Sequence, residues 1–256
     1  MLTEKRFEII LDMLEREGAV KVQTLTSILG ASESTVRRDL TVLDKRGLLK
    51  KVHGGAAPVH RRYSTEEADI SAKRRINSEE KGRIGRLAAA FIEAGDFVYI
   101  DAGTTTAALI EAIDEPGAIY VTNGLGNADK LLRKGYTVHI IGGSLRATTE
   151  AVIGEMAMDA LEQYNFTLGF FGTNGVHPEA GFTTPDVHEG AVKRRALSRC
   201  KRAFVLADSS KFNCITPVHF GDLSQASVIT GRLRDQTYHK YTEILEADKH
   251  DLHGHL

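Results

Sequence analysis

The chain has 256 residues, of which 42% are hydrophobic and 26% charged, and its formal net charge is −1. These values lie in the ordinary range of soluble globular proteins and allow one large domain or two smaller ones. The first ten residues include acidic side chains, and no stretch approaches the roughly 18 apolar residues of a spanning helix, so we expect neither a secretory signal nor a membrane segment. The two cysteines, Cys200 and Cys214, form no close pair, and we expect a cytoplasmic protein.

The charge is distributed unevenly along the chain. Residues 1–75 contain 15 Lys and Arg against 11 Asp and Glu, whereas residues 76–256 contain 18 against 23. A basic N-terminal part on an acidic remainder favours a polyanionic partner for the N-terminal part.

Apolar spacing predicts two short helices at the start of the chain. In "TEKRFEIILDMLER", residues 3–16, apolar side chains recur at helical intervals, and Gly18 follows as a stop signal. "VQTLTSILG" repeats the pattern over residues 22–30, with Gly30 as a C-terminal cap.

A third helix is predicted from an N-cap at Ser32 to about residue 46, followed by Gly47. Two short helices joined by a turn that contains glycine are typical of a helix-turn-helix. The next segment, "LLKKVHGGAA", is apolar and basic and then reaches two glycines, which predicts a short hairpin or wing.

The third predicted helix has a buried and an exposed face. Val36, Leu40 and Leu43 recur at helical spacing and mark the buried face. The opposite face carries hydroxyls and cations, which suit a DNA major groove because Arg reads guanine edges and Lys neutralises phosphates. The alternative is that its arginines pair with acids such as Asp39 on a solvated surface. The candidate DNA contacts on this face are Ser34, Arg38, Thr41 and Lys45, with Arg37 on its flank.

Residues 1–57 resemble the N-terminal winged helix-turn-helix of the DeoR-type bacterial transcriptional regulators. The resemblance rests on "SESTVRRDL", on "LDKRGLLKKVHGGA" and on their spacing. It implies that "RRDL" belongs to a recognition helix and that a wing follows. The residues to which it carries a DNA-binding role are Ser34, Thr35, Arg37 and Arg38, and in the wing Lys50, Lys51 and His53.

Residues 58–77 predict a linker, because "PVHRRYSTEEADISAKRRIN" is highly charged and has no sustained apolar period. Its cations either remain in solvent or touch the DNA backbone. They are Arg61, Arg62, Lys73, Arg74 and Arg75.

Residues 78–256 predict an α/β domain. After a helix-like segment, short apolar runs such as "FVYI", "IYVT", "LGFF", "AFVL" and "SVIT" alternate with further helix-like segments, which indicates parallel strands. Ligands of such sheets bind beyond the carboxyl ends of the strands, where this sequence places most of its distinctive polar residues. The sequence therefore predicts a small-molecule site at those ends.

Several strand-end loops have the chemistry of a sugar-phosphate site. "DAGTTT", residues 101–106, enters a helix whose N–H groups and positive end would hold a phosphate; the alternative is a helix start without ligand. The amides of "TNG" and "GTNG" suit sugar hydroxyls but also favour turns. Arg146 either clamps the anion or forms a surface ion pair, and Lys211 is the best second cation. The candidate effector-binding residues are Asp101, Gly103, Thr104, Thr105, Thr106, Thr122, Asn123, Arg146, Asn174, Gly175, Asp186, Glu189, Lys193 and Lys211.

The DeoR resemblance continues to about Gly231, on the loops just described. It implies a sensor domain that is similar in fold to ribose-phosphate isomerases and binds phosphorylated sugars as inducers. The "DGAD" loop of those enzymes corresponds to "GTNG" here, which has no carboxylate, and Glu189 occupies the place of their proton-transferring Glu. An isolated carboxylate is a poor acid–base system, so sensing is favoured over turnover. The alternative is an isomerase-like enzyme with a fused DNA-binding head.

Taken together, the resemblance implies a repressor of a sugar-utilisation operon that a phosphorylated sugar releases from double-stranded operator DNA. "GFTTPD" followed by "ADSSKF" most resembles the fructose-operon branch, which implies fructose 1-phosphate as inducer. One small head makes few DNA contacts, so we expect a homo-oligomer, and the resemblance implies a dimer or a tetramer. The ten histidines lack zinc-site spacing, and we expect no metal and no cofactor.

Overall fold

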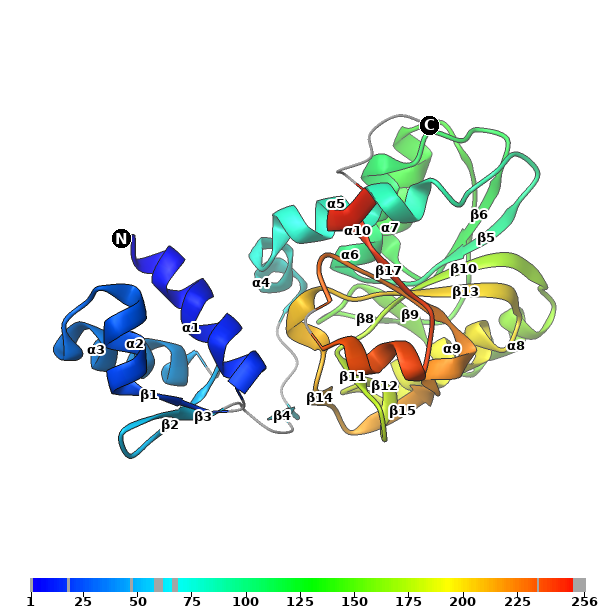
Figure 1. Cartoon of the computed structure of the whole chain (residues 1–256). Coiled ribbons are helices and arrows are strands. Elements are labelled where there is room, and N and C mark those ends of the chain that lie inside the picture. The colour runs from blue at the N-terminus through cyan, green and yellow to red at the C-terminus, as the bar shows by residue number, and fades with distance from the viewer. Residues whose placement is uncertain are drawn as a thin grey trace. The chain divides into compact units, whose positions relative to one another are not determined.

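The computed structural model describes residues 2–17, 19–46, 48–57, 62–65, 69–233 and 235–250. The chain divides into two compact units, residues 1–62 and 63–256 (Figure 1). The predicted helix ends at Gly18 and Gly47 lie outside the described residues, as does Arg61.

The first unit contains, in its described residues, three helices and a three-stranded antiparallel sheet of order β1-β3-β2. Ile10, Leu25 and Leu40, one from each helix, are fully buried in its core. The second helix ends at Gly30 with a left-handed φ of 58°, as its C-terminal cap requires. The elements are α1 (Thr3–Glu17), β1 (Val20–Lys21), α2 (Val22–Leu29), α3 (Glu33–Lys45), β2 (Lys50–Val52) and β3 (Gly55–Ala57).

The second unit is built on a seven-stranded parallel sheet, which confirms the α/β prediction. Its strand order is β17-β16-β13-β10-β5-β6-β7. Its strands are β5 (Phe97–Ile100), β6 (Ile119–Thr122), β7 (Thr137–Ile140), β10 (Phe166–Gly172), β13 (Cys200–Leu206), β16 (Ser227–Thr230) and β17 (Ile244–Glu246).

Helices cover both faces of this sheet (Figure 1). Phe170 and Phe171, neighbours on β10, point to opposite faces and belong to two different hydrophobic clusters. Because both faces are covered, the strands read as continuous apolar runs in the sequence. The helices on the Phe170 side are α5 (Ser78–Ala89), α6 (Thr104–Ala112) and α7 (Leu125–Arg133), and those on the Phe171 side are α8 (Glu155–Glu162) and α9 (Val187–Leu197).

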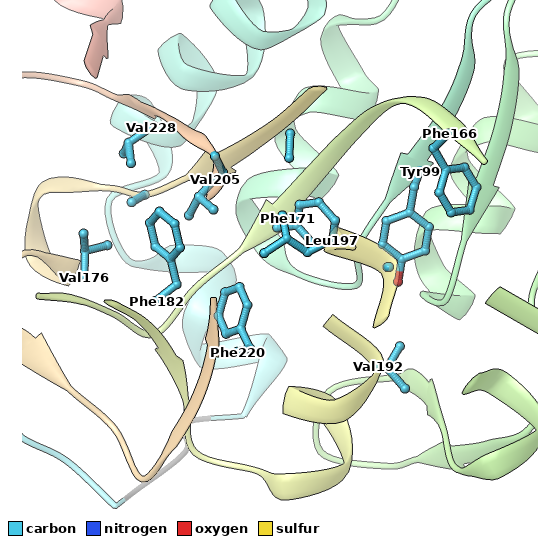
Figure 2. Packing of buried hydrophobic residues seen from close by; sticks show 14 of the residues in the cluster. Tyr99, Phe166, Phe171, Val176, Phe182, Val192, Leu197, Val205, Phe220 and Val228 are labelled. Carbon is cyan, nitrogen blue, oxygen red and sulfur yellow. The ribbon is translucent and has the colours of Figure 1, made fainter. Parts of the chain in front are cut away.

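A small antiparallel sheet adds side chains to the hydrophobic cluster that contains Phe171. The sequence patterns did not predict this sheet. Figure 2 shows Phe182 and Phe220 of this sheet side by side, with ring centroids 5.9 Å apart. Its strands have three or four residues, too few for a visible period of two. The further elements are β11 (Gly175–His177), β12 (Gly181–Thr184) and β15 (Val218–Gly221) in this sheet, and elsewhere β4 (Arg62–Tyr63), β8 (Ser144–Arg146), β9 (Ala151–Ile153), β14 (Cys214–Ile215), η1 (Ser209–Lys211), η2 (Leu223–Gln225), η3 (Gln236–Lys240) and α10 (Ala247–His250).

The predicted linker contains more regular structure than its sequence pattern indicates. Within residues 58–77 the chain forms β4 and the six-residue helix α4 (Ile70–Arg75). None of the α4 residues is buried, so no apolar period marks the helix in the sequence. Among the described residues, no helix has the length and apolar character to cross a bilayer.

The strand order sets where a ligand can bind. The chain runs from β5 outward through β6 to β7, and then returns to build β10, β13, β16 and β17 on the other side of β5. The direction of winding therefore reverses between β5 and β10. Open α/β sheets bind their ligands at the carboxyl ends of the two strands that flank such a reversal.

Candidate functional site

A pocket lies at this reversal point, between the loop that follows β5 and the loop that follows β10. Its walls also receive side chains from α4, α5 and α9 and from the segment after β13. The structure thus brings together residues that are far apart in the sequence. Of the predicted effector-binding residues, those that line the pocket are Gly103, Thr104, Thr105, Asn174, Glu189, Lys193 and Lys211.

The N-terminus of α6 faces the pocket without a side-chain cap. Gly103 occupies the N-cap position, and no side chain accepts a hydrogen bond from the first turn there. The backbone N–H groups at the start of a helix have no partner within the helix, and together with the helix dipole they favour an anion. The hydroxyl of Thr106 points inward instead, donating to the carbonyls of Asp101 (2.6 Å) and Gly103 (3.0 Å). Thr106 therefore shapes the loop and does not line the pocket.

Four lysines line the pocket: Lys73, Lys81, Lys193 and Lys211. Lys193 is buried, forms an ion pair with Asp101 and donates to the carbonyl of Gly172 at 3.1 Å. Burial raises the pKa of Asp101, and the charge of Lys193 opposes that effect. Asp101 is thus the counter-ion of Lys193 and does not itself line the pocket.

Asp208, at the end of β13, organises a second part of this charge cluster. Burial raises the pKa of Asp208, but Lys211, Ser210, Asn77 and Lys81 together outweigh it and hold the pKa below its ordinary value. The amide of Asn77 donates to one oxygen of Asp208 at 2.8 Å. These contacts therefore favour the ionised form of the Asp208 carboxylate.

Glu189 is the acidic residue of the pocket wall, and its partners hold it in place. The hydroxyl of Thr149 donates to it, and Arg146 donates to it at 3.1 Å. Arg146 also lies 3.4 Å from Oδ2 of Asp186. Asp186 is the N-cap of α9, and its Oδ1 accepts a hydrogen bond from the N–H of Glu189 at 2.9 Å. Arg146 and Asp186 thus support Glu189 from behind, since the pocket wall does not include them.

Thr122, Asn123 and Gly175 were predicted to bind the effector, but the structure gives them internal roles. Thr122 is fully buried and accepts from the N–H of Gly124 at 3.0 Å. Asn123 is 2% exposed and accepts from the N–H of Ala102 at 2.7 Å, which braces the loop after β5. A β carbon at Gly175 would lie 2.4 Å from a backbone carbonyl, so close packing requires glycine there.

Several residues of the pocket wall were not among the predicted site residues. Lys81 did carry a signal, because it shares one face of α5 with the buried Ile84 and Ala88, and a lysine on an apolar face needs an explanation. Lys73 was assigned to solvent or to DNA, whereas it lines the pocket. Thr149 and Thr173 also line it and had no distinguishing sequence context.

The exposed face of α3 is the second candidate site. Val36, Leu40 and Leu43 are fully buried, as predicted, so the opposite side of the helix faces outward. The alternative that the two arginines pair with acids on a solvated surface holds for Arg37, whose partner is Glu33. The acid named there, Asp39, is not the partner, because it is buried and accepts from Arg6 of α1 at 2.7 and 3.0 Å.

The polar side chains of this face differ in the ion pairs and hydrogen bonds that they form within the protein. Arg37 forms an exposed ion pair with Glu33, with contacts of 2.5 and 2.9 Å. Arg38 is exposed and forms no ion pair with any residue that the structure describes. The hydroxyls of Ser34 and Thr35 lie 2.9 Å from that of Ser32, which caps the helix.

The wing is joined to the same face. Lys51 donates from its ammonium to the hydroxyl of Thr41 at 2.7 Å and from its backbone to Asp44 at 3.0 Å. The wing therefore extends the polar surface of α3. Further exposed cations and polar groups on this surface are Lys45, Lys50 and His53.

Two family models match the chain. Residues 6–62 match the DeoR-like helix-turn-helix domain, and residues 76–232 match the DeoR C terminal sensor domain. The chain is 43% identical over 244 residues to the uncharacterized HTH-type transcriptional regulator FruR of Bacillus subtilis (strain 168). This match covers 95% of the present chain and 96% of FruR. It is 33% identical over 252 residues to the lactose phosphotransferase system repressor of Streptococcus mutans, with 96% and 100% covered.

Among solved structures, ribose 5-phosphate isomerase A of Methanocaldococcus jannaschii matches 53% of this chain and 55% of that chain, with a TM-score of 0.39 and 13% identity. A likeness of this degree says nothing about activity.

Proposed function

The chain belongs to the DeoR family of DNA-binding transcriptional regulators, and from this premise we propose that it represses a sugar-utilisation operon and that a phosphorylated sugar releases it from its operator. It is a regulator and not an enzyme, since both matched domains are regulator domains. The relatives whose names include the word repressor support the direction of regulation.

The observation that carries the proposal is the convergence of an uncapped helix N-terminus and four lysines on one pocket. Backbone N–H groups and ammonium groups are the donors that proteins use for phosphate dianions. The threonine hydroxyls and the amide of Asn174 in the same wall suit sugar hydroxyls. A phosphate group adds negative charge that these ammonium groups attract, so the pocket favours a phosphorylated ligand over a free sugar.

The DNA-binding role belongs to α3 and the wing. We assign base contacts to Arg38 and Arg37 and backbone contacts to the hydroxyls and lysines around them. A single unit of this size presents few such contacts, and we infer a homo-oligomer in which two units engage two half-sites. Sedimentation of the free protein and of its complex with operator tests that inference.

Fructose 1-phosphate is our first candidate for the effector, on the motif "GFTTPD" and the loop "ADSSKF". The test begins with selection of a high-affinity operator from random duplex DNA. Calorimetry then measures binding of fructose 1-phosphate, fructose 6-phosphate, glucose 6-phosphate, ribose 5-phosphate and the corresponding free sugars. The proposal expects at least one phosphorylated sugar to bind more tightly than its free form and to lower operator affinity. Equal binding of free and phosphorylated sugars would overturn it.

Two variants, one at each end of β13, test whether the effector binds in this pocket. Lys211 follows the carboxyl end of β13 and lines the pocket, whereas Lys201 is exposed near the opposite end of the same strand. We expect Lys211→Met to lose the response to the sugar phosphate and Lys201→Met to keep it. Each variant removes one positive charge, so a difference between them reports position and not net charge.

A further inference from the structure

Helix α4 is short and contributes residues to the wall of the pocket. Ile70 and Lys73 of α4 line the pocket, as does Ile76 just after it. The helix has six residues and buries none of them. A helix of this length is unstable by itself in water, so its contacts with the rest of the sensor unit decide whether it is ordered.

Polar contacts join α4 to two parts of the sensor unit. The ammonium of Lys81, in the first turn of α5, donates to the carbonyl of Lys73 at 2.6 Å. On the other side, Arg74 lies 3.5 Å from the carboxylate of Glu150, and the N–H of Ile70 donates to a carbonyl of the same loop at 3.3 Å. The Lys81 contact is the shortest of these, and Lys81 is also the most buried of the residues that make them.

The segment that follows α4 is anchored to the sensor unit. Asn77 separates α4 from α5 with a left-handed backbone, φ 52°, and its amide is hydrogen bonded to Asp208. Helix α5 then packs on the sheet through Ile84 and Ala88, which are both fully buried. The chain can therefore move on the α4 side of Asn77 without disturbing the sheet.

Lys73 of α4 interacts electrostatically with Lys81, another lysine of the pocket. Burial lowers the pKa of Lys81, Asp208 opposes this effect, and the positive charges of Lys211 and Lys73 add to it. The ammonium groups of Lys81, Lys211 and Lys73 thus belong to one pocket, and Lys73 is carried by α4. A dianion among these ammonium groups reverses the sign of that interaction, because each lysine is then attracted to the shared ligand.

We propose that Lys73 is a ligand-binding residue and that a bound phosphate dianion pins α4 onto the sensor unit through Lys73 and Lys81. This inference rests on the proposed function of the pocket. Among the described residues, α4 is the first helix that follows the DNA-binding unit. Its ordering would therefore carry the occupancy of the pocket toward that unit. Order–disorder transitions of a short segment are a common form of such switches.

The test compares Lys73→Met with Arg75→Met in the full-length protein. Both substitutions remove one positive charge from α4, but Arg75 is exposed and does not line the pocket. Hydrogen exchange of residues 70–76 is measured with and without a saturating amount of the tightest-binding sugar phosphate of the calorimetric panel. Operator affinity is measured under the same two conditions, and thermal unfolding verifies that both variants fold.

In the wild type and in Arg75→Met, we expect the ligand to slow exchange in residues 70–76 by about tenfold or more, the factor of one charge-assisted hydrogen bond. In Lys73→Met, the ligand should still bind, with affinity reduced by about tenfold or more, but should neither slow this exchange nor release the operator. Ligand binding without slower exchange in the wild type overturns the inference alone. So does an equal effect of the two substitutions. A panel in which no sugar phosphate binds overturns the proposed function and this inference with it.

Discussion

Replacing Arg38 by alanine should weaken binding to the selected operator without affecting the fold. Arg38 is exposed on α3, opposite the buried Val36, Leu40 and Leu43, and no acid of the described chain holds it. A lost bidentate contact to a base costs about 1–3 kcal/mol, which corresponds to an affinity reduced about 5- to 150-fold for each unit engaged.

The assay is fluorescence anisotropy with the selected operator and with a scrambled duplex, over a range of salt concentrations. If Arg38 contacts a base, Arg38→Ala should lose affinity for the operator and little for the scrambled duplex, with an unchanged salt slope. If Arg38 contacts a phosphate, both affinities should fall and the slope should decrease by about 1. The ratio of the two affinities therefore separates the two kinds of contact.

Arg133→Ala is the matched control. Arg133 is an exposed helical arginine of the sensor unit that pairs with Asp129 four residues earlier, as Arg37 pairs with Glu33. It should bind operator like the wild type. If Arg38→Ala also binds operator like the wild type at every salt concentration, α3 does not enter the groove and the assignment of the recognition face fails.

Three further predictions concern the sensor unit. Lys193→Met should destabilise it by about 3–5 kcal/mol in urea, because Asp101 is left buried without its counter-ion, and Asp101→Asn in the same chain should restore part of the loss. Gly175→Ala should lower the melting temperature, since its β carbon would meet a carbonyl at 2.4 Å, whereas Gly142→Ala has open space and should leave it unchanged. The pKa of Asp208 is held below its ordinary value in the folded state, so its ionised form stabilises the fold above the unfolded pKa of about 3.9 and this contribution disappears as the pH falls through the folded value. Asp208→Asn should therefore lose less stability than the wild type between pH 7 and pH 3, and an equal loss would contradict the assignment.

Local signals in the sequence predicted the first unit well. Ser32 caps α3, and Val36, Leu40 and Leu43 are buried, because capping and helical periodicity depend on residues within a few positions of one another. The parallel strands were also predicted from local sequence. Strands that helices cover on both faces of a sheet appear as continuous apolar runs.

The candidate pocket was predicted only in part, because its residues meet through long-range contacts. Thr122 and Asn123 follow a strand, as a ligand-binding pair would, yet hydrogen bonds turn them inward. Lys73 belongs to the segment that was predicted as a linker, and Lys81 belongs to the helix that follows it. Nothing in their local sequence indicates that both line one pocket with Lys211. The position of a side chain relative to a pocket depends on how distant segments pack, which a single sequence does not display.

The division of labour in the pocket bears on how such regulators diversify. The groups that suit a phosphate come from the start of α6 and from lysines, whereas Asn174 and its neighbours occupy a loop that follows a different strand. None of these loop positions belongs to the hydrophobic clusters that hold the sheet together. After a gene duplication, the side chain of Asn174 can therefore change without altering these clusters or the start of α6. Under the proposed function, a copy of this regulator would acquire a new sugar through substitutions in this loop while the groups assigned to the phosphate stay unchanged.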